Sequence, residues 1–306
     1  MDQLDRCRGA LLGLAAGDAV GTTVEFRARG TFAPVTDMTG GGPFHLRAGQ
    51  WTDDTSMALC LAASLVERGR FDARDQIERY CRWLDTGYMS SNGRCFDIGI
   101  TVRGALARFK QSGEPFAGST DPRSAGNGSL MRLAPVVLFF HPDHDAAIHH
   151  AGESSKTTHG AAECVEACRL FGALLCQALD GATKNEIATC GATFAQQLRE
   201  PRIVAIAGGA YRHKRAGEVK GTGYVVDSLE AALWAFHGTD SFEAAVLAAA
   251  NLGDDADTTA AICGQIAGAF YGERGIPGRW LDKLAMRDFI ADHAVTLSAP
   301  RGEKTR

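Results

Sequence analysis

Two acidic segments, roughly two hundred residues apart, are the strongest chemical signal in the sequence. Residues 52–55 read Thr-Asp-Asp-Thr, and residues 254–259 read Asp-Asp-Ala-Asp-Thr-Thr. Either segment alone could serve only to cap the apolar helix that follows it, because Asp and Thr accept the free N–H groups of a first turn. Brought together, their five carboxylates would repel one another and take up protons unless cations bind between them.

The donors in both segments are all oxygens, since neither segment contains His or Cys. Such donor sets favour Mg²⁺, Mn²⁺ or Ca²⁺ over Zn²⁺ or copper, and the lack of EF-hand spacing argues against Ca²⁺. The two segments therefore predict a pair of divalent cations that activates water and orients an oxygen-rich substrate.

Three further places carry groups suited to a substrate. Residues 126–129 (Gly-Asn-Gly-Ser) precede an apolar run, where they either expose backbone N–H groups to an anion or simply form a loop-to-helix turn. They lack the GxGxxG spacing and a preceding strand, which excludes a Rossmann site. His159 follows Thr158 at the expected start of a long helix, where it binds a phosphate or ribose or else faces solvent. Tyr224 either stacks on a base or anchors its helix in the core.

The elements that position these residues are helices, because apolar residues recur with a helical period along most of the chain. Thr183 and Glu186 predict a capping box, and Val35–Met38 and Ile203–Ile206 are the only strand candidates. The sequence predicts one compact all-α domain over residues 1–298 and a polar tail over 299–306. The expected helices cover residues 4–17, 53–68, 73–86, 98–112, 128–140, 143–154, 159–180, 184–198, 226–237, 242–251, 258–271 and 279–297, with C-terminal caps at Gly69, Gly87, Gly113, Gly181, Gly238 and Gly272.

Composition narrows the class of protein. The 306 residues are 45% hydrophobic and 22% charged, which excludes wholesale disorder, and the net charge of −4 argues against nucleic acid and anionic membranes as partners. No apolar run is long enough to span a bilayer, and the acidic N-terminus is a poor signal peptide. Nine cysteines without a CxxC pair indicate buried thiols in a reducing cytoplasm. The 36 glycines indicate tight turns and close backbone approaches.

Four histidines lie close together in the sequence, at positions 141, 144, 149 and 150. We expect a loop and a helix start capped by Asp143 here rather than a zinc site, because no cysteine lies near.

Seven short motifs occur in order along the chain. They are Gly17-Asp18-Ala19 with Glu25, residues 49–55, Phe96-Asp97-Ile98-Gly99, Gly126-Asn127-Gly128-Ser129, Thr158-His159, residues 223–227 and residues 253–259. In these motifs the sequence resembles the ADP-ribosylglycohydrolase family, most closely its bacterial dinitrogenase-reductase-activating type, and the resemblance extends from Gly9 to about Leu284.

This resemblance implies an all-α orthogonal bundle with two Mg²⁺ or Mn²⁺ ions, and it assigns roles to residues. The implied metal ligands are Thr52, Asp53, Asp54, Asp255, Asp257 and Thr258. Asp254 falls outside this set, and we expect it to cap the helix or support a ligand. Glu25 would orient or deprotonate the attacking water, and Asp97 would face the scissile end of the substrate and pair with a guanidinium. The implied substrate-binding residues are Gly126, Asn127, Gly128, Ser129, His159 and Tyr224.

The function implied by the resemblance is metal-dependent hydrolysis of ADP-ribose from modified proteins, with the N-glycosidic bond to arginine as the expected linkage. Ile100 stands where the family commonly has Asn, which keeps other linkages open: serine, O-acetyl-ADP-ribose or a nucleic-acid end. A third hypothesis is an immunity or regulatory protein that binds an ADP-ribosyltransferase. We expect a cytoplasmic monomer whose partners are the ADP-ribosylated protein and ADP-ribose.

Overall fold

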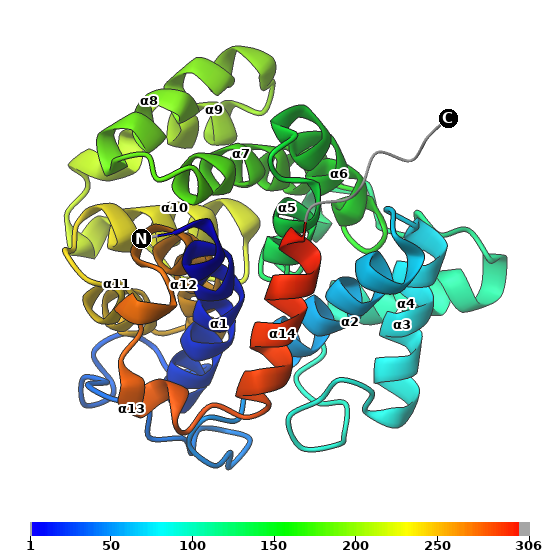
Figure 1. Ribbon diagram of the computed structural model, residues 1–306, viewed down its shortest axis with the longest axis horizontal. Helices are drawn as coiled ribbons and strands as arrows, with labels where there is room; N and C mark the ends of the chain where they lie inside the picture. Colours follow the sequence, from blue (N-terminus) through cyan, green and yellow to red (C-terminus); the bar gives the residue numbers. More distant parts are fainter. Residues whose placement is uncertain (1, 300–306) are drawn as a thin grey trace.

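The computed structural model describes residues 2–299, and the regular secondary structure within them is helical (Figure 1). This part has 14 α-helices, six short 3₁₀ helices and three isolated β-bridges but no strand, which confirms the all-α prediction. The α-helices are α1 (Gln3–Gly21), α2 (Asp53–Arg68), α3 (Ala73–Thr86), α4 (Ile100–Ser112), α5 (Ala134–Phe140), α6 (His144–Lys156), α7 (Ala162–Leu179), α8 (Lys184–Phe194), α9 (Pro201–Ala207), α10 (Val225–His237), α11 (Phe242–Ala250), α12 (Ala256–Tyr271), α13 (Gly278–Leu281) and α14 (Arg287–Ser298).

Both strand candidates are wrong. Val35–Met38 lies in a loop, where Asn251 makes two hydrogen bonds to the backbone of Val35. Ile203–Ile206 lies in α9, which begins at Pro201 with its ring at the first helical position. The fixed backbone angle of that proline favours a helix start over the weak strand preference of the two isoleucines.

The central pair of helices, α1 and α12, packs backbone against backbone (Figure 1). From Gly9 to Gly21, every fourth residue of α1 is a glycine that faces α12. A Cβ added at any of these four glycines would lie only 2.1–2.3 Å from a carbonyl oxygen of α12. The residue pairs run in opposite directions along the two helices: Gly9 with Gly268, Gly13 with Gly264, Gly17 with Ala260 and Gly21 with Ala256. This antiparallel packing brings the end of α1 beside the start of α12, where the second acidic segment lies.

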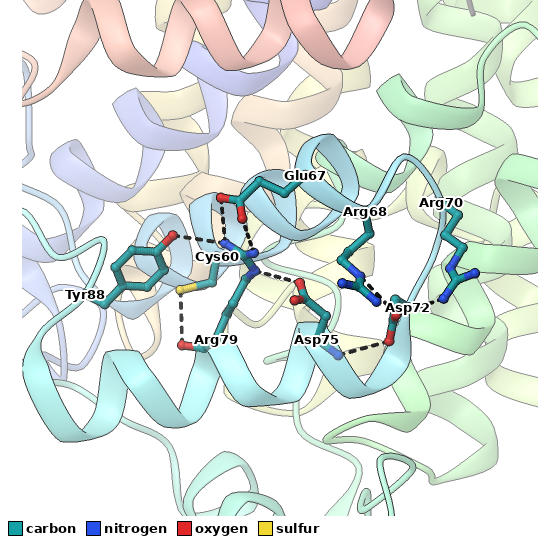
Figure 2. Close-up of polar contacts among 8 residues, drawn as sticks. All are labelled: Cys60, Glu67, Arg68, Arg70, Asp72, Asp75, Arg79 and Tyr88. Carbon is teal, nitrogen blue, oxygen red and sulfur yellow. Dashed lines mark hydrogen bonds and ion pairs between the residues drawn. The ribbon is translucent and has the colours of Figure 1, made fainter.

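The helix that begins with the first acidic segment, α2, is held from its far end by α3. Arg79 of α3 binds both oxygens of Glu67 on α2 and also Asp75 and the hydroxyl of Tyr88 (Figure 2). The Cys60 thiol of α2 also donates to the carbonyl of Arg79. Arg79 is a planar, multivalent donor, so one side chain can fix the angle between the two helices.

The expected helix over 279–297 is broken into α13 and α14, which corrects that prediction. At the break, the N–H of Ala285 donates to Gly49, and the indole of Trp51 donates to the Ala285 carbonyl. Met286 then adopts a left-handed backbone conformation before α14 begins. These long-range bonds replace helical ones and tie the C-terminal region to the residues directly before α2.

Two helices that follow residues 126–129 and His159 begin later than the sequence predicts. The helix expected over 128–140 starts at Ala134, because the side chain of Gln265 in α12 binds the backbone before it. The Gln265 amide oxygen accepts the Ala134 N–H, and its NH₂ group donates to the carbonyls of Leu130 and Met131. The helix over 159–180 starts at Ala162, so His159 does not open α7. It lies in the connection from α6, where its N–H and that of Gly160 bond to Ser155 and Ser119.

Other local predictions are confirmed. The capping box of Thr183 and Glu186 opens α8, Asp143 caps α6, and Gly69, Gly87 and Gly113 end their helices in the left-handed conformation. The nine cysteines are all free. No helix among the described residues has the length and apolar character needed to cross a membrane. The single domain over 1–298 remains a prediction, and residues 300–306 of the expected tail lie outside the described residues.

Candidate active site

The two acidic segments meet at the N-termini of α2 and α12. The hydroxyl of Thr258 donates to Asp54 Oδ1 at 3.1 Å, and the hydroxyl of Thr52 lies 3.1 Å from Asp257 Oδ2. Asp257 lies between two groups of carboxylates whose oxygens come within 4.8 Å of one another; one group adds Asp18 and Asp54, and the other adds Glu25 and Asp255.

Most of the capping of these two helices comes from residues outside the segments. Neither Thr52 nor Asp255, the two N-cap residues, makes a side-chain cap bond. Instead Asp18, from α1, accepts the backbone N–H groups of Thr52 and Thr55 at 2.8 and 3.0 Å. Glu25 accepts those of Ala256 and Asp257 at 2.8 and 3.2 Å through Oε2.

These hydrogen bonds bear on whether the acidic segments serve only as helix caps or also bind cations. Asp18 and Glu25 each accept two of the free N–H groups at a helix start, and Asp257 Oδ1 accepts one more, that of Thr258, at 2.7 Å. Capping therefore accounts for neither the Asp54 carboxylate nor Oδ2 of Asp257, and these oxygens are available for another role.

The acidic cluster (Asp18, Glu25, Asp53, Asp54, Asp97, Asp255 and Asp257) is poor in positive charge. Burial and the nearby Asp257 raise the pKa of Asp18 and of Asp255 to about 7. The same two causes raise the pKa values of Asp53 and Asp54 well above the usual range. Burial, Asp257 and Asp53 raise the pKa of Asp97 to about 12. Without a cation these groups hold protons, because burial and mutual repulsion both disfavour the ionised forms.

The cluster fits a cation in two further respects. Asp54 Oδ2 is buried and has no hydrogen-bond partner among the described residues, although buried carboxylate oxygens are normally paired. The single hydroxyl hydrogen of Thr52 faces two carboxylates, Asp18 at 2.9 Å and Asp257 at 3.1 Å, and can serve only one of them. A cation would satisfy the remaining lone pairs, and an all-oxygen donor set suits Mg²⁺ or Mn²⁺.

The cluster opens onto a cavity of about 440 Å³, here called the acidic cavity. Its walls contain most of the residues predicted from the sequence: Glu25, Asp53, Asp97, Gly126, Asn127, Gly128, His159, Asp255, Asp257 and Thr258. Asp54 and Thr52 are completely buried behind this wall. Asp254 is exposed, and its backbone forms hydrogen bonds with Phe26 and Arg27. Its side chain caps no helix, so the expectation of a cap at this residue is wrong.

Two residues at the mouth of this cavity have a left-handed backbone that is unusual for their type. Phe26 (φ 61°) follows Glu25, and Asp97 (φ 60°) precedes the start of α4. Asp97 is therefore not the N-cap of α4, a position that Gly99 occupies. Such conformations cost free energy and are retained where neighbouring structure fixes a side chain for a purpose.

The loop of residues 126–129 offers backbone donors to this cavity. Asn127 is anchored at both ends: its N–H donates to Gly223, and its side-chain amide donates to Asp255 at 2.8 Å. The N–H groups of Gly128 and Ser129 donate to no acceptor within residues 2–299. The Ser129 side chain itself is buried, where it accepts from Ser155 and Cys168. The loop thus leaves two backbone N–H groups, rather than the serine hydroxyl, without a protein partner.

His159 is a buried donor with a fixed orientation. Arg132, completely buried and without an ion pair within residues 2–299, donates to Thr158 Oγ1 at 2.7 Å and to the Gly128 carbonyl at 2.7 Å. Thr158 Oγ1 also lies 2.8 Å from His159 Nδ1. Because arginine can only donate, the threonine hydroxyl keeps its own hydrogen for Nδ1.

The hydrogen of neutral His159 is therefore assigned to Nε2, which lies on the side of Gly126 and Gly128. Burial and Arg132 lower the pKa of His159 to about 3, so the ring is neutral at pH 7. Sequence reasoning singled out His159 but missed Arg132, which has no local signal. Asp18 was likewise part of a recognised motif without an assigned role.

Tyr224 lies outside the acidic cavity, in an adjoining cavity of about 780 Å³ that shares Thr101, Gly126 and Gly223 with it. Its ring is only partly buried, and its hydroxyl donates to Glu163 at 2.6 Å and accepts from Arg202 at 3.0 Å. Tyr224 thus packs against the core from its edge and is not enclosed by it. The larger cavity is lined by Glu163 and Glu200 but by no member of the acidic cluster, five members of which line the smaller cavity.

Both the sequence and the fold of this chain are similar to those of known proteins. Residues 1–304 match the model of the ADP-ribosylglycohydrolase family. The chain is 49% identical to the ADP-ribosylarginine hydrolase Tri1 of Pseudomonas putida (strain GB-1), over 94% of this chain and 76% of that protein. It is 33% identical to the ADP-ribosyl-[dinitrogen reductase] glycohydrolase of Rhodospirillum rubrum, over 92% of this chain and 91% of the relative. A solved structure titled ADP-ribosylglycohydrolase-related protein complex superposes with a TM-score of 0.85 at 43% identity, covering 97% of this chain and 98% of that one.

Proposed function

Since this chain belongs to the ADP-ribosylglycohydrolase family, we propose that it releases ADP-ribose from arginine side chains of modified proteins. The chain is a glycohydrolase, and the arginine linkage is taken from relatives named ADP-ribosylarginine hydrolase at 45–49% identity. The observation that carries the proposal is the pair of acidic segments, which meet at two helix starts that are capped mainly by Asp18 and Glu25.

In this proposal the acidic cluster holds two divalent cations, Mg²⁺ or Mn²⁺. Their ligands would be Thr52, Asp53, Asp54, Asp255, Asp257 and Thr258, supported by the unpaired Asp54 oxygen and the raised pKa values of Asp53 and Asp54. When bound, the cations would neutralise the carboxylates, bind ribose hydroxyls and lower the pKa of water.

Glu25 and Asp97 would act on the reacting groups. Glu25 is held by two backbone bonds to Oε2, which orient the carboxylate at the cavity wall to accept a proton from the attacking water. Asp97, at the mouth of the cavity, would pair with the guanidinium of the arginine as the bond to the anomeric carbon breaks. The surrounding carboxylates would stabilise the positive charge that develops on the ribose.

The remaining residues would hold the ADP portion. The unpaired N–H groups of Gly128 and Ser129 and the Nε2–H of His159 suit the diphosphate, and Asn127 and Gly126 shape the loop that presents them. Tyr224 would stack on adenine in the adjoining cavity, where its ring is partly exposed.

A linkage panel tests this proposal. The protein is offered ADP-ribosyl-arginine, ADP-ribosyl-serine and O-acetyl-ADP-ribose, each with Mg²⁺, Mn²⁺ or excess chelator, and released ADP-ribose is quantified. We expect fastest release from the arginine conjugate and loss of release with chelator. Release from none of the three would refute the proposal.

A second candidate substrate class is another ADP-ribose linkage, favoured by Ile100. This side chain is 92% exposed at the first turn of α4 and lines the mouth of the acidic cavity. It cannot make the hydrogen bonds of an amide, so it offers nothing polar to a guanidinium. Preferred cleavage of the serine or acetyl ester conjugate in the same panel would support this candidate over the first.

The proposed setting is the cytoplasm, supported by nine free cysteines, most of them buried. The proposed partners are the ADP-ribosylated protein and ADP-ribose, and the proposed oligomeric state is a monomer.

A further inference from the structure

We propose that His141, His144 and Asp180 form a second metal site, specific for a transition-metal ion of the Zn²⁺ class and separate from the acidic cluster. Three elements contribute one side chain each: the end of α5, the first residue of α6 and the end of α7. None of the three lines the acidic cavity.

The geometry brings three candidate ligand atoms together. His141 Nε2 lies 2.8 Å from Asp180 Oδ1, and His144 Nε2 lies 3.0 Å from Asp180 Oδ2. All three ligand atoms lie within 4.8 Å of one another. Ligand atoms in a tetrahedral zinc site, each about 2.0–2.1 Å from the ion, are about 3.3 Å apart. Small side-chain rotations that open these contacts by a few tenths of an ångström would therefore admit the ion.

The donor chemistry differs from that of the acidic cluster. Two imidazole nitrogens and one carboxylate suit Zn²⁺, Co²⁺ or Ni²⁺, whereas Mg²⁺ prefers oxygen. Three protein ligands leave a fourth tetrahedral position for water. The side chains of His144 and Asp180 are 34% and 40% exposed, so an ion can enter from solvent.

His141 is oriented before any ion binds. Its side chain is only 4% exposed, and the amide of Gln3, at the start of α1, lies 2.8 Å from Nδ1. Ligating histidines usually donate their second ring N–H to such a partner. Rotation of the Gln3 amide by half a turn would let its oxygen accept the Nδ1–H, leaving the Nε2 lone pair for the ion.

The position of Asp180 also favours a cation. Asp180 is the C-cap of α7, an 18-residue helix whose negative end disfavours a carboxylate. A bound cation would offset both negative groups. It would also connect the end of α7 to the α5–α6 connection and, through Gln3, to α1.

The alternative to a metal site is that the two histidines only donate hydrogen bonds to Asp180. The loop and helix start expected from the sequence would allow either arrangement. The sequence could not distinguish these cases, because Asp180 is far from the histidines along the chain and reaches them only through the fold.

The test is a Zn²⁺ titration of the full-length protein in excess Mg²⁺, which occupies oxygen-only sites. Calorimetry measures stoichiometry and affinity, Co²⁺ replaces Zn²⁺ for visible absorption, and thermal melts report folding. The variants are His144→Ala and Asp180→Asn. The matched control is His213→Ala, which removes an exposed histidine outside the cluster.

We expect the wild type and His213→Ala to bind one Zn²⁺ per chain and to gain thermal stability. Affinity should fall by more than about 10-fold in both cluster variants, since loss of even an outer partner costs 10–100-fold. The tetrahedral Co²⁺ absorption should vanish with it. Zn²⁺ binding by the cluster variants with wild-type affinity, or no binding by the folded wild type, would overturn the proposal. Either result is independent of the linkage panel.

Discussion

Replacing Thr158 with valine tests how the protein fixes the ring hydrogen of His159, which lines the acidic cavity. Valine keeps the shape of threonine but removes the hydroxyl between Arg132 and His159 Nδ1. The Arg132 bond at 2.7 Å is charge-assisted, and its loss leaves a buried donor unpaired at a cost of about 1.5–3 kcal/mol. We expect a lower melting temperature with the fold retained.

The functional effect follows from the tautomer of His159. The hydroxyl bond to Nδ1 favours the Nε2–H form by about 1 kcal/mol, a factor of about 5 in population. Without it, fewer molecules present Nε2–H to the diphosphate, so the affinity for ADP-ribose should fall by up to about 5-fold. The conservative variant Thr158→Ser keeps the hydroxyl and should bind nearly as the wild type does.

Two assays check this reasoning. Nitrogen-15 NMR of the histidine ring reports which nitrogen carries hydrogen, and calorimetry reports ADP-ribose affinity. An Nδ1–H signal for His159 in the wild type would refute the tautomer assignment. Equal ADP-ribose affinity in Thr158→Val and the wild type would refute a role for Nε2–H in binding.

Glu25→Gln should keep ADP-ribose affinity within a few-fold, since the amide oxygen can still accept from Ala256 and Asp257, while turnover falls by roughly 10²–10⁴; wild-type turnover would place the base elsewhere. Tyr224→Ala should weaken ADP-ribose binding by about 1–3 kcal/mol in calorimetry, and Tyr224→Phe should retain most of the affinity; an unaffected Tyr224→Ala would remove the stacking role. The pKa values of Asp18 and Asp255 are raised to about 7, so without cations their protonated forms stabilise the fold at low pH and this contribution is lost as pH rises from about 4 to 7. Mg²⁺ should therefore raise the melting temperature more at pH 8 than at pH 5, and an equal gain at both would contradict a cation bound by these acids.

What the sequence could predict was local. Helix ends marked by a glycine or a capping box, such as Gly69 and Thr183, were placed correctly, because these signals act through neighbouring backbone groups. The sequence also identified the acidic segments as candidate metal ligands, because each contains more carboxylates than a helix cap requires. Their convergence is produced by the glycine-lined packing of α1 on α12, whose four-residue spacing is visible in the sequence once the partner helix is known.

What the sequence could not predict depends on distant partners. Gln265 delays the start of α5, and Gly49 with Trp51 breaks the last helical stretch, so neither boundary has a nearby signal. The roles of Asp18 and Arg132 were missed for the same reason. Each is a single buried charged residue that binds a residue distant in the sequence, Thr52 for Asp18 and Thr158 for Arg132.

The most direct test of the account compares Asp257→Asn with Asp254→Asn in release of ADP-ribose from ADP-ribosyl-arginine. Asp257 is buried between both carboxylate groups, whereas Asp254 is exposed and has a left-handed backbone that asparagine tolerates. With Mg²⁺ or Mn²⁺, hydrolysis should fall by more than about 100-fold in Asp257→Asn and stay near the wild-type rate in Asp254→Asn. Full activity of Asp257→Asn, or of the wild type in excess chelator, would contradict the claim that these carboxylates hold the cations on which hydrolysis depends.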